Sequence, residues 1–97
     1  MALVFGRIRI NKTFEEWQRV FLEHRGARES EGIEDVMHAP VVGSQEVIYV
    51  VRTAYPRRVH DMSWANGARA VIEASGHQLG SETYTVCDEF VEGTLGI

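Results

Sequence analysis

Cysteine is almost absent from this sequence of 97 residues, in which Cys87 is the only one. A single cysteine cannot form a disulfide within the chain, and no charged-then-apolar leader precedes the first patterned segment. We therefore expect a reducing, cytoplasmic location and a core that forms without covalent cross-links.

Long apolar runs and an excess of basic residues are also missing. Apolar runs such as Val47–Val51 are far shorter than the roughly 20 residues that a membrane helix needs. The formal net charge is -4, and the only basic pair is Arg57-Arg58. Nucleic-acid binding is driven largely by Lys and Arg side chains that displace counterions from phosphates. We therefore expect neither a membrane nor a nucleic acid as a partner.

The sequence contains none of the short motifs typical of nucleotide or serine chemistry. No Gly-x-Ser-x-Gly elbow, phosphate loop or dinucleotide fingerprint occurs in it. The four histidines, which are His24, His38, His60 and His77, have none of the short paired spacings of metal sites. Two acidic residues follow Cys87 and disfavour its thiolate. The sequence predicts no metal site, no cofactor and no cysteine nucleophile.

What the sequence does contain is a complete set of patterned segments. Hydrophobic residues make up 44% and charged residues 25%, which is typical of a folded domain, and the length suits a single domain over residues 1–97. In chain order the patterns predict a strand over Leu3–Ile10, a helix from Thr13 to Gly32, strands over Ile33–Val42 and Val47–Thr53, a helix from Pro56 to about Ser75, a strand over Leu79–Phe90 and a tail over Val91–Ile97.

Local signals support these helix boundaries. Thr13 and Glu16 have the spacing of a capping box, in which hydroxyl and carboxylate each satisfy a free backbone N–H. Gly32 and Gly76 are placed to end the two helices, because glycine tolerates the left-handed conformation found there. The Asn66-Gly67 pair predicts a kink or a break in the second helix.

The order strand, helix, strand, strand, helix, strand predicts a ferredoxin-like βαββαβ fold of the α+β class, with a four-stranded antiparallel sheet. Right-handed crossovers place the first and third strands in the centre, and Pro40 favours an edge position for the second. Both helices then cover one face of the sheet. Apolar side chains on the other face need a cover, so we expect a homodimer that associates through this open sheet face.

One stripe of the first predicted helix carries two residues with chemical potential. His24 and Arg28 lie one turn apart, close enough to act together on an anion or a carbonyl. Alternatively, His24 is hydrogen-bonded where helix and sheet meet and Arg28 binds strand carbonyls. Because this stripe is expected to pack on the covered side of the sheet, with the cavity on the other side, we interpret both residues as structural.

Several motifs resemble those of a known superfamily. They are the Phe14-x-x-Trp17 helix start, His24-x-x-x-Arg28 with Gly32-Ile33, the strand Val47–Val51, and Trp64 through Ser75-Gly76-His77. Together they resemble the dimeric α+β-barrel proteins, and most of all a group of small bacterial domains of unknown function. The resemblance implies a dimeric barrel. The superfamily includes cofactor-free monooxygenases, haem-degrading enzymes, lactone isomerases and proteins with no known reaction, and fold alone does not choose among them.

The resemblance does not extend to the residues of haem degradation. Haem-degrading relatives carry an Asn on the first strand, together with a Trp and a His farther along. This chain has Trp64 and His77, but its first strand carries Arg7 and Arg9, and its first Asn is Asn11. The resemblance therefore implies none of those catalytic roles here.

Strand alternation suggests where a site would form. The candidate residues are His38 and Tyr49 as catalytic groups, with Arg7, Arg9, Trp64 and His77 as ligand-binding groups. If His38, Tyr49 and the arginines project toward the open sheet face, they line an apolar cavity with a few converging polar groups, the usual form of a small-molecule site. We expect a small aromatic or carboxylate-bearing ligand there, held by an arginine, with His38 exchanging a proton. Alternatively, these residues lie at the dimer seam or in solvent.

Two functions remain open from the sequence. The first is a homodimeric small-molecule-binding protein or cofactor-free enzyme, monooxygenase-like or isomerase-like, with its site in the barrel cavity. The second is a non-catalytic dimeric module, structural or regulatory, whose barrel is filled by its own side chains. A cavity of roughly 300 Å³ or more on the open sheet face, lined by His, Tyr and Arg, would favour the first, and a plugged barrel would favour the second.

Overall fold

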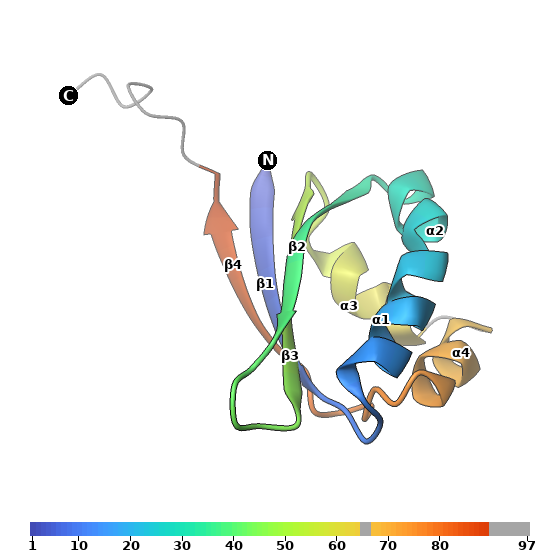
Figure 1. The fold of residues 1–97 in the computed structure, drawn as a ribbon. Helices are drawn as coiled ribbons and strands as arrows, with labels where there is room; N and C mark the ends of the chain where they lie inside the picture. The colour runs from blue at the N-terminus through green and yellow to red at the C-terminus, as the bar shows by residue number, and fades with distance from the viewer. Residues whose placement is uncertain (65–66, 90–97) are drawn as a thin grey trace.

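The computed structural model describes residues 1–64 and 67–89, so Asn66, Phe90 and the predicted tail lie outside the described residues. Its elements are β1 (Ala2–Arg9), α1 (Phe14–Glu23), α2 (Arg25–Ser30), β2 (Ile33–Pro40), β3 (Glu46–Thr53), α3 (Arg57–Trp64), α4 (Ala68–Ala74) and β4 (Thr83–Asp88). The four strands form one antiparallel sheet in the order β2-β3-β1-β4 (Figure 1). This is the predicted ferredoxin-like fold.

The positions of the strands in the sheet agree with the sequence. β1 and β3 are central, and β2, which ends at Pro40, is an edge strand, where a residue without an N–H is tolerated. The last strand is shorter than predicted. A turn joins the Ser81 N–H to the Gln78 carbonyl, and Gly80 within it has a φ of +94°, so extended pairing begins only at Thr83.

Each predicted helix is divided into two. The capping box at Thr13 and Glu16 is present, but α1 ends at Glu23 because His24 leaves the helical conformation, with φ -102° and ψ 12°. The His24 Nδ1 atom lies 2.8 Å from the Val20 carbonyl oxygen, a local side-chain bond that competes with the helix. The second helix is broken as predicted, with Gly67 at a φ of +86° directly before α4.

Strand pairing decides which side chains lie under the helices. Residues paired across antiparallel strands project from the same face. His38, Tyr49, Gly6 and Tyr84 are paired in one row that crosses β2, β3, β1 and β4. Tyr49 is buried with the core that the helices cover, so the whole row belongs to the helix side of the sheet.

The opposite face of the sheet combines apolar and charged side chains. Met37, Val50, Phe5 and Thr85 form one row across it, and Val50 at its centre is buried while Phe5 and Met37 are exposed. Figure 1 shows all the helices on the other side of the sheet, and among the described residues none covers this open sheet face. Apolar side chains are therefore left on it, as the sequence predicts.

An aromatic cluster fixes α1 on the sheet. The His38 ring lies among the rings of Phe14, Trp17 and Phe21, with centroid distances of 6.1, 5.9 and 5.2 Å. The Gln18 Nε2 atom lies 3.0 Å from the His38 Nε2 atom. An amide nitrogen only donates, so His38 accepts this hydrogen bond as a neutral ring. Burial lowers the pKa of His38; Asp35 opposes this shift, and Arg25 and Arg28 add to it.

The phase of α1 predicts different effects for two adjacent residues. Phe21 stacks on Trp17 with a centroid distance of 4.6 Å, whereas the Leu22 side chain is 41% exposed. Phe21→Ala is expected to lower the free energy of unfolding by about 3 to 5 kcal/mol, and Leu22→Ala by less than about 1 kcal/mol. Chemical denaturation of the two variants measures the difference. Equal losses would show that Leu22 is buried as well, for example by a second subunit.

The His38 environment predicts a stability that depends on pH. The folded pKa of His38 lies below its ordinary value of 6.5, so the unfolded chain binds the proton more readily. The contribution of neutral His38 to the free energy of unfolding is therefore fully present above about pH 6.5. It is lost as the pH falls from there toward the lower pKa of the folded state. Chemical denaturation measures the free energy of unfolding at pH 7 and at pH 5. The loss of this free energy between the two pH values should be smaller for His38→Gln than for the wild-type protein. His60→Gln, on the exposed side of α3, is the matched control, and an unchanged difference in His38→Gln would contradict the assignment.

Candidate functional site

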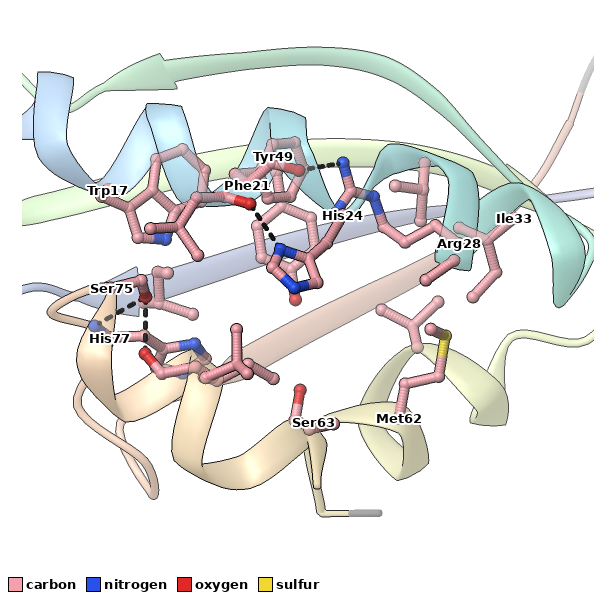
Figure 2. A pocket seen from close by; sticks show the side chains of 18 of the residues that line it. Trp17, Phe21, His24, Arg28, Ile33, Tyr49, Met62, Ser63, Ser75 and His77 are labelled. Carbon is pink, nitrogen blue, oxygen red and sulfur yellow. Dashed lines mark hydrogen bonds between the residues drawn. The ribbon is translucent and has the colours of Figure 1, made fainter. Parts of the chain in front are cut away.

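A cavity of about 250 Å³ lies between the two helix pairs, with the sheet as its floor. Its walls are mostly apolar, and a few polar side chains interrupt them. Figure 2 labels Trp17, Phe21, His24 and Arg28 on one side of the cavity and Met62, Ser63, Ser75 and His77 on the other. The cavity is thus on the helix side of the sheet, whereas the sequence analysis expected a cavity on the open sheet face, inside the barrel of a dimer.

The structure separates the residues that the sequence analysis grouped. Tyr49 and His77 line the cavity, and His38 belongs to the same face but lies in the aromatic cluster beside it. Arg7 and Arg9 project from the open sheet face, on the other side of β1. The prediction that His38, Tyr49 and these arginines converge is therefore wrong.

A β-bulge explains why alternation misplaced His38. Asp35 pairs with Val51 and Met37 pairs with Val50, so Val36 is an extra residue in β2 and the alternation reverses after it. Regular alternation would place His38 on the face opposite Asp35, whereas both face the helices. Trp64 is the last residue of α3, and its side chain lies outside the described part of the structure. Its predicted contact with a ligand therefore stays a prediction.

Arg7 is engaged in a surface ion pair. Its Nε and Nη2 atoms bind the two carboxylate oxygens of Glu46, each at 2.9 Å, and the Ser44 hydroxyl donates to the same carboxylate at 2.6 Å. These hydrogen bonds lower the pKa of Glu46 to about 2 and raise that of Arg7. Arg7 therefore holds a carboxylate of its own chain.

His24 and Arg28 line this cavity, on the covered side of the sheet where the sequence analysis expected none. Arg28 donates two hydrogen bonds to Asp35, at 2.8 and 2.7 Å, and one to the Phe21 carbonyl at 2.7 Å. Its guanidinium also lies 3.7 Å from the centroid of the Phe21 ring. Burial alone would raise the pKa of Asp35, but Arg28 and Arg25 hold it below its ordinary value. The positive charge of Arg28 is thus already neutralised at the cavity wall.

His77 brings a paired polar group to the cavity wall. Its Nε2 atom lies 2.6 Å from a carboxylate oxygen of Glu82, and both side chains are almost completely buried. The second oxygen of Glu82 accepts a hydrogen bond from the Gly80 N–H at 2.9 Å. Burial lowers the pKa of His77 more than Glu82 raises it, so the ring is neutral near pH 7. A carboxylate that holds Nε2–H leaves Nδ1 as the basic nitrogen.

The signal for this pair in the sequence is weak. Glu82 follows His77 by five residues, a spacing that matches neither a helix nor a strand period. The Gly80 turn between the two residues folds the chain back and places the carboxylate beside the ring. The pairing therefore depends on the turn, and alternation could not identify Glu82.

The floor of the cavity depends on Gly6. A Cβ atom at this position would lie 2.3 Å from Cζ of Tyr49 and 2.7 Å from its hydroxyl oxygen. The Tyr49 ring therefore lies across β1 at the one place in this row where no side chain stands. Burial raises the pKa of Tyr49 well above its ordinary value, and Tyr84 and Glu82 add to the shift. Tyr49 is a protonated phenol at neutral pH.

The described residues form neither a metal site nor a membrane-spanning helix. In that part of the chain, no group of three or more His, Cys, Asp or Glu side chains is arranged to hold a metal ion. The helices there are all too short or too polar to cross a membrane.

Comparisons with known proteins show what the fold is similar to. No protein-family model and no curated protein sequence matches the chain. Among solved structures, a putative antibiotic biosynthesis monooxygenase from Deinococcus radiodurans superposes with a TM-score of 0.57 at 10% identity, covering 94% of both chains. Protein Atu4242 from Agrobacterium tumefaciens gives a TM-score of 0.61 at 12% identity, covering 91% of this chain and 92% of that one.

The cofactor-independent oxygenase SnoaB from Streptomyces nogalater is a third similar structure. Its TM-score is 0.51 at 12% identity, and the match covers 93% of each chain. Identities this low establish the fold and leave the activity open. The chain shares the ferredoxin-like α+β fold of these structures, among them antibiotic biosynthesis monooxygenase-like proteins.

Proposed function

We propose that this chain is a homodimeric, cofactor-free enzyme that binds a small molecule between its sheet and its helices and transfers a proton there. The observation that carries the proposal is the His77–Glu82 pair in the wall of an otherwise apolar cavity. The volume of about 250 Å³ is somewhat below the roughly 300 Å³ at which typical small-molecule sites begin, so the ligand we propose is small.

The cavity favours a neutral, largely apolar ligand. Most of its walls are hydrophobic, and the guanidinium of Arg28 is occupied by Asp35. An anionic ligand would therefore lose its hydration without gaining a free cation, which is costly in an apolar site. The aromatic ligand expected from the sequence fits this cavity better than the carboxylate-bearing one.

The chemistry that the pair supports is proton abstraction. A buried carboxylate orients the imidazole and stabilises the imidazolium that forms when Nδ1 accepts a proton. If the proton leaves a carbon next to a carbonyl, the C–H electrons form an enolate, and His77 then returns the proton to another carbon in an isomerisation. In the oxygenase version, the carbanion attacks dioxygen, and a CH₂ group and O₂ become a carbonyl and water. SnoaB, described as cofactor-independent, shares the fold, which makes the oxygenase version worth testing.

Hydrogen exchange tests the role of His77. The neutral bicyclic ketone 2-tetralone has acidic protons next to its carbonyl, and their replacement by deuterium in D₂O is followed by NMR. Wild-type protein is expected to accelerate the exchange, and His77→Gln to lose at least about tenfold of that acceleration, since a positioned base contributes roughly 10² to 10⁴. Glu82→Gln should lose activity as well. His60→Gln, outside the cavity lining, is the control; equal rates for wild type and His77→Gln would contradict the base.

The homodimer is proposed from the open sheet face. Phe5 and Met37 are exposed there around the buried Val50, and burying such a surface against a second copy is favourable. Sedimentation at micromolar concentration should give a dimer mass for the wild-type protein. Phe5→Glu should give a monomer, whereas Val42→Glu, at a turn residue that is already 99% exposed, should leave the dimer intact. A monomer mass for the wild-type protein would contradict this association.

A further inference from the structure

His24 is a second histidine in the cavity wall, and the proposed proton transfer does not use it. It is the residue between α1 and α2, and Figure 2 shows its ring directed from that side toward the cavity. His77 lies on the opposite side of the cavity and is buried, whereas His24 is exposed. The ring of His24 is therefore an accessible polar group on a wall that is mostly apolar.

The contact with Val20 determines what each nitrogen of this ring can do. Nδ1 lies 2.8 Å from the Val20 carbonyl oxygen, and a carbonyl oxygen only accepts, so Nδ1 carries a proton. In the neutral ring the other nitrogen, Nε2, then has a lone pair and accepts a hydrogen bond. No hydrogen bond joins Nε2 to another of the described residues. The backbone of α1 thus fixes one nitrogen and leaves the second free to accept.

The surroundings of this acceptor define the ligand group that complements it. The group must donate a hydrogen bond, because Nε2 of the neutral ring has no proton to give. An ammonium group donates as well, but its charge would lose hydration against walls that are mostly apolar. A hydroxyl group donates a hydrogen bond and carries no charge. A neutral ligand with a hydroxyl group on an apolar skeleton therefore fits both the acceptor and the walls.

We propose that His24 is a specificity-determining residue, whose Nε2 atom accepts a hydrogen bond from a hydroxyl group of a neutral ligand in the cavity. The assignment rests on the proposed function and adds the chemical class of the ligand to it. The substrate then carries two features, a hydroxyl group that His24 binds and an acidic C–H group that faces His77. Binding the hydroxyl group on one wall orients the rest of the molecule toward the base on the other.

Three molecules with one bicyclic skeleton test this assignment. They are 2-tetralol, whose hydroxyl group donates, 2-methoxytetralin, whose ether oxygen cannot donate, and tetralin, which has no oxygen. Titration calorimetry at pH 8, which favours the neutral ring, measures their affinities for the wild-type protein and for His24→Asn. The Asn amide can keep the bond to the Val20 carbonyl but places no acceptor where Nε2 was. His24→Asn is expected to weaken 2-tetralol about 3- to 10-fold, the loss of one hydrogen bond, and to leave the other two unchanged.

Two further readouts separate recognition from packing. His24→Gln is the conservative variant, because the longer Gln amide reaches the place of Nε2, and it should weaken 2-tetralol less than His24→Asn does. Nitrogen-15 NMR of the His24 ring reports which nitrogen carries the proton. At pH 8 the proton should be on Nδ1, and the Nε2 resonance should move when 2-tetralol is added and stay unchanged with 2-methoxytetralin.

The outcomes distinguish this assignment from the function on which it rests. A ring with its proton on Nε2, or equal weakening of 2-tetralol and tetralin in His24→Asn, would overturn the hydrogen bond. Equal weakening of 2-tetralol in the Asn and Gln variants would overturn Nε2 as the acceptor. Wild-type protein that binds none of the three molecules would overturn the small-molecule function itself.

The exchange reaction separates His24 from His77. The ketone 2-tetralone has no hydroxyl group, so its hydrogen exchange should be as fast with His24→Asn as with the wild-type protein. Slower exchange in His24→Asn would show that His24 takes part in removing the proton and would overturn a role in recognition alone. Unchanged binding of 2-tetralol by His24→Asn, together with exchange that depends on His77, would overturn the assignment of His24 and leave the base intact.

Discussion

The close approach of the Tyr49 ring to the backbone of Gly6 is the contact on which the cavity depends. Any side chain at residue 6 would occupy the space of that ring, since even a Cβ would lie 2.3 Å from it. Without the space, Tyr49 would have to turn up into the cavity or out of the core. The missing side chain in the middle of β1 thus sets the floor of the cavity and brings two phenols toward each other across one strand.

The helices are attached to this sheet as two pairs, and the cavity is the space between them. Arg28 of α2 binds Asp35 of β2, and the aromatic cluster around His38 fixes α1, so this pair is held near one edge of the sheet. On the other side, His77 follows α4 and forms an isolated bridge with Ile10 just after β1. Each pair of helices packs on its own part of the sheet. The space between the two pairs is lined mostly by apolar side chains, with a few polar side chains in its walls.

The two faces of the sheet have different physical roles because their polar groups are satisfied differently. On the open sheet face, charged side chains pair with each other in solvent, as Arg7 does with Glu46, and such pairs contribute little to stability. On the helix side, Glu82 and His77 are paired out of solvent. Buried titratable groups with perturbed pKa values, such as His77, are typical of functional sites, which is why we place the chemistry there.

The sequence by itself determined the element order, the central and edge strands, the capping box at Thr13, the break at Gly67 and the apolar open face, because these follow from local periodicity and from glycine and proline geometry. Which residues meet in the site was decided only by the tertiary structure. One extra residue in β2 turned His38 to the helix side, and the Gly80 turn paired Glu82 with His77. Neither a bulge nor a side-chain contact across a turn leaves a periodic signal, since both depend on strand pairing and packing between segments far apart in the chain.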